Sequence, residues 1–153
     1  MSSVTQKNPV RIFVSHVWRT DEDYHRIFEY LESASNFFYL NTSAPDQRPQ
    51  GDREALREEM RKQINNAEVV ILVSSLYRRN VDWIEFQIRC AKAFDKPIVV
   101  LEPFGAQDTI PPAVQEAADE VVPWDQRQLV DAVKRQARHE ETTRYDVIEF
   151  KLD

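Results

Sequence analysis

A single polar residue, Gln87, interrupts the apolar face of a predicted helix and is the strongest candidate for chemistry in this chain. At 3.6 residues per turn, Gln87 lies one turn after Trp83 and about one turn before Cys90. A buried side-chain amide without hydrogen-bond partners costs on the order of 1–3 kcal/mol. The pattern therefore predicts an amide that is either satisfied by the fold or placed to meet a polar ligand.

Other polar side chains follow the predicted strands, where an open α/β sheet forms its ligand site. These are Ser15, His16, Asn41, Ser43, Ser74 and Ser75. His16 is either a loop histidine or a contact to a phosphate or base. Asn41 and Ser43 are either turn residues or partners of a ribose, and Trp83 either packs in the core or lines the pocket. The pair Arg78–Arg79 is either solvated or neutralises a diphosphate.

Several familiar kinds of site are excluded by residue types that are rare in the chain. With only two glycines, Gly51 and Gly105, it has neither a glycine-rich dinucleotide turn nor a phosphate-binding P-loop. It also lacks a nucleophile elbow and a Ser-x-x-Lys motif. The one cysteine, Cys90, cannot form an internal disulfide and is most simply a packed thiol, and the three histidines have no metal-site spacing.

Length and composition favour one globular domain. The chain has 153 residues, of which 42% are hydrophobic and 30% charged, and its net charge is −6. The acidic balance argues against nucleic acid as a partner. No apolar run approaches the roughly 20 residues that span a bilayer, and the N-terminus has no apolar signal-peptide core. We therefore expect no membrane association and a cytoplasmic location.

The chain alternates between predicted strands and helices. Residues 10–15, 68–75, 96–101 and 120–123 are typical of strands, and residues 37–46 form a less regular stretch. Helices are predicted for 21–34, from Asp52 as an N-cap to Ala67, for the segment around Gln87, for 112–118 and for 126–137. The run 69–73 is continuously β-branched or aliphatic, so it should be central. This β-α order predicts a parallel sheet with helices on both faces and a ligand crevice beyond the carboxyl ends of its strands.

Three parts are expected along the chain. Residues 1–9 are predicted to be a flexible N-terminus, residues 10–137 the α/β domain, and residues 138–153 a C-terminal tail. The tail alternates with period two from Tyr145 to Leu152, which is compatible with an added edge strand or with pairing to another chain.

Segments spread along most of the chain together resemble bacterial TIR-like proteins and, more narrowly, the ThsB component of Thoeris anti-phage systems. The resemblance runs from about residue 10 to residue 133 and rests on the order and spacing of residues 11–16, 41–45, 69–75, 82–88, 96–100 and 110–124. It implies a flavodoxin-like TIR fold, with an open, mostly parallel five-stranded sheet, over the domain 10–137.

The resemblance also implies an activity. TIR enzymes of this kind cleave the glycosidic bond between nicotinamide and ribose in NAD and make an ADP-ribose-derived signal for a separate effector protein. NAD would then be a substrate, with no permanently bound cofactor and no metal. The partners implied are an NAD or ADP-ribose-type nucleotide, a phage-derived trigger, and further copies of the chain in a homo-oligomer or filament. Ser15, His16, Asn41, Ser43, Ser74 and Trp83 would contact the NAD or its ribose.

The catalytic position departs from the family pattern. In the family a glutamate follows the helix tryptophan by four positions, whereas here Trp83 plus four is Gln87. Loss of nicotinamide leaves a ribose with oxocarbenium character, which an anion about 4 Å away stabilises by roughly 4 kcal/mol at an effective dielectric near 20. Glutamine lacks that charge, so we expect turnover slower by about two to three decades while binding survives. Glu85 lies about 200° away around the helix and should point elsewhere.

Two other functions remain open at this point. The chain is alternatively a non-catalytic TIR-like assembly or adaptor module, which the missing glutamate favours. The third hypothesis is an enzyme similar to nucleoside deoxyribosyltransferases, which use a comparable open sheet and also need a carboxylate near the sugar. Whether Gln87 is natural or an experimental replacement does not follow from the residues.

Overall fold

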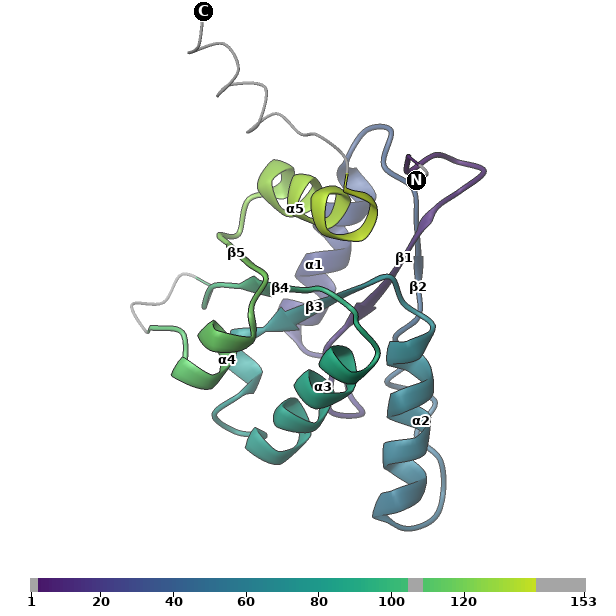
Figure 1. Ribbon diagram of the computed structural model, residues 1–153, viewed down its shortest axis with the longest axis vertical. Helices are drawn as coiled ribbons and strands as arrows, with labels where there is room; N and C mark the ends of the chain where they lie inside the picture. Colours follow the sequence, from purple (N-terminus) through teal and green to yellow (C-terminus); the bar gives the residue numbers. More distant parts are fainter. Residues whose placement is uncertain (1–2, 105–108, 140–153) are drawn as a thin grey trace, which may run out of the picture.

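The protein forms one five-stranded parallel sheet in a computed structural model that describes residues 3–104 and 109–139 (Figure 1). The strand order is β2-β1-β3-β4-β5, and every pair is parallel where the sequence predicted a mostly parallel sheet. The elements are β1 (Val10–Val14), α1 (Glu22–Ser33), β2 (Tyr39–Asn41), α2 (Arg53–Asn65), β3 (Val69–Val73), the 3-10 turn η1 (Ser74–Leu76), α3 (Val81–Ala93), β4 (Ile98–Leu101), α4 (Pro112–Ala117), β5 (Glu120–Val122) and α5 (Gln126–Arg138).

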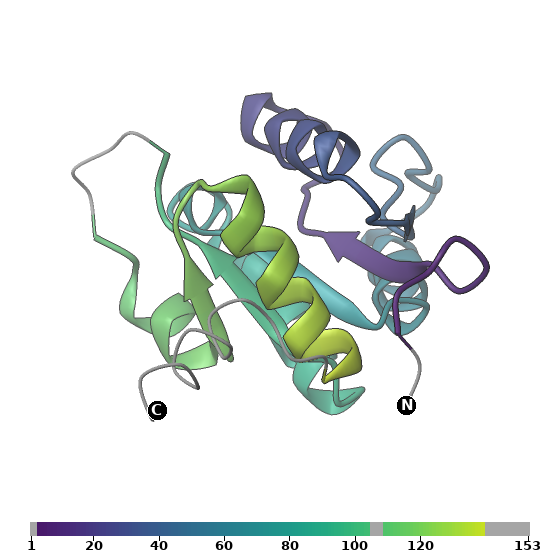
Figure 2. The same cartoon turned by 90° about the horizontal axis from the view of Figure 1, so that it is seen from above.

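The helices cover both faces of the sheet, as predicted. In Figure 1, α1 and α5 lie above the sheet and α2, α3 and α4 lie below it; seen from above, α5 crosses over the strands (Figure 2). Alternate strand residues therefore feed two cores. Ile12 and Ile71 pack with α1 and α5, whereas Phe13 and Leu72 pack with the helices of the other face. Cys90 belongs to the second core, and its burial raises the pKa of the thiol.

Two local predictions are confirmed and one stretch is more regular than expected. β3 is the central strand, and all five of its residues are buried. Asp52 caps α2, since its side chain accepts a hydrogen bond of 3.0 Å from the backbone N–H of Ala55. Tyr39–Asn41 forms the short edge strand β2 inside the predicted irregular stretch, because it pairs with Val10 to Ile12 of β1.

The start of the chain is tied to its last described helix. Val4 packs in the core above the sheet, and Arg138 at the end of α5 donates to the carbonyls of Ser3, Asn8 and Pro9. The flexibility expected for residues 1–9 and the domain limits at 10 and 137 remain predictions. The predicted edge strand in the tail lies outside the described residues. None of the helices described is both long and apolar enough to cross a membrane.

Candidate ligand-binding site

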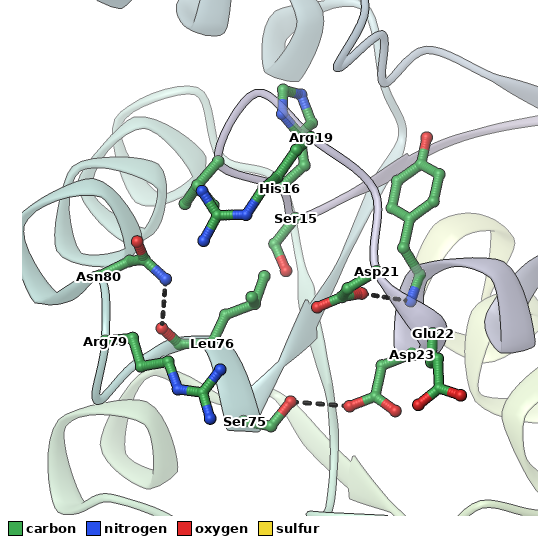
Figure 3. A pocket seen from close by; sticks show the side chains of 12 residues that line it. Ser15, His16, Arg19, Asp21, Glu22, Asp23, Ser75, Leu76, Arg79 and Asn80 are labelled. Atoms are coloured by element: carbon green, nitrogen blue, oxygen red, sulfur yellow. Dashed lines mark hydrogen bonds between the residues drawn. The ribbon is translucent and has the colours of Figure 1, made fainter.

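A cavity of about 300 Å³ opens at the carboxyl ends of β1 and β3, where the fold predicts a ligand crevice (Figure 3). Ser15 and His16 line it directly after β1. The first turn of α1 forms a second wall, and the segment from Ser75 to Asn80 forms a third. Two neighbouring parallel strands thus deliver their following loops to one hollow.

Opposite charges occupy opposite walls of this cavity. The guanidinium groups of Arg19 and Arg79 lie on one side, and Asp21, Glu22 and Asp23 lie on the other (Figure 3). The acids are there because carboxylates favour a helix N-terminus, and Asp21 caps α1 by accepting from the Tyr24 N–H at 2.8 Å. The site therefore offers separate binding surfaces for a cation and an anion.

A second cavity, of about 520 Å³, adjoins the first and shares Glu22, Asp23, Ser75 and Arg79 with it. It adds two further arginines, Arg26 and Arg78, and the aromatic ring of Phe104. The Phe104 ring is 45% exposed, and the Arg26 guanidinium carbon lies 3.7 Å from its centroid. Together the two cavities form a groove within the size range of small-molecule and cofactor sites.

Two of the predicted site serines use their side-chain oxygens in hydrogen bonds with the protein's own backbone. The Ser15 oxygen accepts a hydrogen bond from the buried N–H of Val73 at 3.0 Å. The Ser74 hydroxyl donates to the Leu101 carbonyl at 2.7 Å. Both residues line the groove, but their hydrogen bonds also hold the ends of neighbouring strands together.

Ser15→Ala should therefore destabilise the protein. Removing the hydroxyl leaves the buried Val73 N–H without its acceptor, which costs about 1–3 kcal/mol. Ser75→Ala is the matched control, because Ser75 is exposed and donates to the Asp23 carboxylate; we expect a change within about 0.5 kcal/mol. Urea unfolding of both variants measures the difference. Equal stabilities would contradict the fastening role of Ser15.

His16 is buried, and both of its ring nitrogens are engaged within the protein. Nε2 is 2.9 Å from Oε1 of Gln63, and Nδ1 accepts from the Trp18 backbone N–H at 3.1 Å. Burial lowers the His16 pKa, although Gln63 and the charge of Asp46 act in the opposite direction. The ring is thus a neutral wall of the cavity.

Gln87 is fully buried behind this wall and does not line either cavity. Its Nε2 donates to the His16 carbonyl at 2.7 Å, so the fold provides a hydrogen-bond partner for the amide nitrogen. Among residues 3–104 and 109–139, its Oε1 finds no hydrogen-bond partner, and neither does the buried indole N–H of Trp18. Trp18 also has a φ of +68°, a strained value for a bulky residue. Contact between Gln87 and a ligand in the groove thus requires the segment after β1 to move.

Of the remaining predicted residues, Asn41 and Ser43 lie next to this groove without lining it, and Trp83 lies outside it. Asn41 and Ser43 both contact the hydroxyl of Tyr24, a residue that lines the first cavity. The Asn41 side chain also accepts from the Ser43 N–H at 2.9 Å, the bond of an ordinary turn. Trp83 lies apart from them between α2 and α3, where the Arg53 guanidinium carbon is 5.5 Å from its ring.

Four residues that line the groove were not predicted as site residues: Arg19, Asp23, Arg26 and Phe104. Two signals were available for them. Asp23 belongs to the acidic first turn of a predicted helix, and Phe104 follows shortly after a buried strand. No signal in the sequence indicates that Arg26, one turn into α1, reaches the ring of Phe104.

Most residues of this site lie in a part of the chain that matches a known protein family. A search of curated proteins finds no match. A family model described as Thoeris protein ThsB, TIR-like domain, matches residues 13–108, from the middle of β1 to beyond β4. The match spans more than half of the chain and contains both walls of the groove that carry charge. The chain therefore belongs to the family of the TIR-like domain of Thoeris protein ThsB.

Proposed function

We propose that this TIR-type defence module binds NAD or an ADP-ribose-type nucleotide in the groove formed by the two cavities. The observation that carries the proposal is the charge separation across the first cavity. NAD combines a negatively charged diphosphate with a positively charged nicotinamide ring. The arginine wall suits the diphosphate, and the carboxylates of the α1 N-terminus suit the ring.

The exposed aromatic ring supports the same ligand. Phe104 stands at the second cavity with the Arg26 guanidinium over one face of its ring, so a base can stack against this pair next to a bound phosphate. The dinucleotide would then extend along the groove, with its diphosphate near Arg79, which lines both cavities.

Cleavage of the bound nucleotide is proposed to be weak in this chain. Gln87 occupies the position of the family glutamate but has no charge, and it is covered by the segment that carries His16. The full proposal is an NAD-cleaving enzyme of the defence type that binds its substrate but cleaves it slowly. Its ADP-ribose-derived product would act on a separate effector, after assembly of several copies and a phage-derived trigger.

Arg79→Gln should weaken NAD binding. A hydrogen bond to a charged group contributes about 1.5–3 kcal/mol, so the dissociation constant should rise roughly 10- to 100-fold. Arg127→Gln is the control, since Arg127 is an exposed arginine of α5, outside the groove. The measurements are calorimetric titration with NAD and the melting temperature as NAD is added, because a ligand of the folded state must raise it. An equal loss in both variants would exclude Arg79 as a diphosphate contact.

The chemical step is tested by restoring the acid in Gln87→Glu. We expect this variant, in assembled form and with a phage-derived trigger, to release nicotinamide from NAD while the unmodified chain is slower by about two to three decades. If the folded, assembled variant leaves NAD intact, the enzymatic part of the proposal fails.

A non-catalytic assembly module is the second candidate function. The burial of Gln87 outside both cavities favours it, because a fold that hides this position has no acid to present to a sugar. Absence of any melting shift at millimolar NAD would favour this function over nucleotide binding.

A further inference from the structure

Gln63 is a buried glutamine whose side chain has every hydrogen-bonding position filled. It lies in the last turn of α2 and is 3% exposed. Its Oε1 lies 2.9 Å from both Nε2 of His16 and the backbone N–H of Ala44. Its Nε2 donates to the Ala44 carbonyl at 3.3 Å and to the Glu59 carboxylate at 3.1 Å. An amide has two acceptor positions and two donors, so none is left for another ligand.

These partners fix the orientation of the amide and the tautomer of His16. The Ala44 N–H is always a donor and its carbonyl always an acceptor, so the Gln63 oxygen must face the imidazole. His16 must then donate from Nε2 to that oxygen. The other ring nitrogen accepts from the Trp18 N–H, which independently requires an unprotonated Nδ1.

We propose that Gln63 is a positioning residue of the nucleotide site, which locks His16 in the neutral Nε2–H tautomer and links the residues after β2 to the cavity wall. The proposal rests on the proposed nucleotide site. The link to β2 is double, because Thr42 donates its hydroxyl to the Gln63 carbonyl at 2.9 Å while Ala44 binds the side chain. Displacement of this loop therefore shifts His16, a residue of the cavity wall.

His16 also connects Gln63 with α3. Its carbonyl accepts from Gln87, while its ring binds Gln63, so one residue joins the end of β1 to two of the helices below the sheet, α2 and α3. The charged groups that act on this unit are Glu59, bonded to Gln63, and Asp46, whose charge acts on the imidazole. Loss of the Gln63 acceptor frees the ring and, through it, the segment that covers Gln87.

Histidine NMR tests the lock directly, because the chain has only three histidines, His16, His25 and His139. Gln63→Glu places a carboxyl group between the His16 ring and the two acceptors that now bind the amide nitrogen, the Ala44 carbonyl and the Glu59 carboxylate. The ring and the new acid should then titrate as a coupled pair, with the His16 titration midpoint above that of the unmodified protein. In Gln63→Met the acceptor is lost, and the Nδ1–H tautomer should become populated in the ring ¹⁵N shifts. Gln128→Glu, an exposed glutamine of α5, adds the same charge as a control and should leave His16 unchanged.

NAD titration of the same variants tests the link to the site. We expect Gln63→Met to weaken NAD binding at least about tenfold, which corresponds to 1.4 kcal/mol, with Gln128→Glu unchanged. Unchanged His16 signals in both Gln63 variants would overturn the proposal, and so would an altered His16 with unaltered NAD affinity. If the unmodified protein binds no NAD, the proposed function itself fails, and the His16 signals still report whether Gln63 holds the ring. Should Gln63→Met not fold, Gln63→Glu gives both readings.

Discussion

Replacement of Arg138 by methionine is expected to destabilise the protein by about 1.5–3 kcal/mol at neutral pH, because it removes a charged hydrogen-bonded pair and leaves the partly buried Glu68 carboxylate with Arg11 as its remaining cationic partner. Arg138 is 7% exposed, and its guanidinium group binds the Glu68 carboxylate, with one bond of 2.9 Å from Nη2. Glu68 directly precedes the central strand β3. The same guanidinium group donates to carbonyls of the N-terminal segment, so it joins the start, middle and end of the described chain.

Arg11→Met is the matched control, since Arg11 contacts the same carboxylate from the surface. Its side chain is 50% exposed, and its Nη1 lies 3.3 Å from Glu68. Exposed ion pairs of this kind contribute at most about 1 kcal/mol. Denaturant unfolding should therefore show a larger loss of stability for Arg138→Met than for Arg11→Met, by about 1 kcal/mol or more. Similar losses would show that burial does not distinguish the two arginines.

The pH dependence gives a second check on the Arg138 pair. Burial opposes ionisation of Glu68, but its bonds with Arg138 and with the Arg11 backbone, together with both positive charges, outweigh burial and lower its pKa. A depressed pKa stabilises the folded protein at pH values above the ordinary pKa of glutamate. That stability is lost as the pH falls through the pKa of Glu68 in the folded protein. The gap between the unmodified protein and Arg138→Met should thus narrow on acidification. A gap that stays constant would exclude the Glu68 charge as its source.

The parts of the fold that were predictable depend on local patterns. The five-residue run of β3 predicts a buried central strand because both of its faces are apolar. Asp52 is predicted as a helix cap because it precedes a periodic apolar face. β2 gave no such pattern. It is a three-residue edge strand with partly exposed side chains, and only its pairing with β1 makes it a strand.

The candidate site was predictable in position but not in detail. The rule that ligands bind beyond the carboxyl ends of parallel strands placed Ser15, His16 and Ser74 at the groove, where they are found. It did not reveal that the serines bond to backbone groups 58 and 27 residues away. Gln87 was identified from its misfit on an apolar face, but its partner, the His16 carbonyl, is 71 residues distant. Such pairings depend on the packing of whole elements.

Gln87→Glu is the second change with a large expected effect, because the present amide donates a hydrogen bond that a carboxylate cannot make. The Gln87 Nε2 points at the His16 carbonyl from a site with no solvent exposure. A glutamate there must either stay protonated and donate, or ionise and face a carbonyl oxygen. Burial and the carbonyl both favour the neutral form, so the native pKa of the new acid should be well above its ordinary 4.3 or so.

A raised pKa fixes the sign of the stability change. The protonated acid replaces the amide at low pH, so the variant should approach the unmodified protein there. As the pH rises above the unfolded value and through the native one, this stability is lost, to a limit of about 3–4 kcal/mol at pH 7 if the folded acid must remain protonated. Gln87→Met is the control, since it also removes the donor but cannot titrate; its loss of about 1–3 kcal/mol should not vary with pH.

Activity of the Gln87→Glu variant should change with pH in the opposite direction to its stability. Only the ionised acid can stabilise an oxocarbenium-like ribose, and only the protonated acid keeps its bond to His16. Nicotinamide release from NAD should consequently rise over the same pH range in which the free energy of unfolding falls. Parallel measurements of unfolding and nicotinamide release across that range test whether both follow one ionisation. A pH-independent stability loss equal to that of Gln87→Met would mean that the new carboxylate does not sit against the His16 carbonyl.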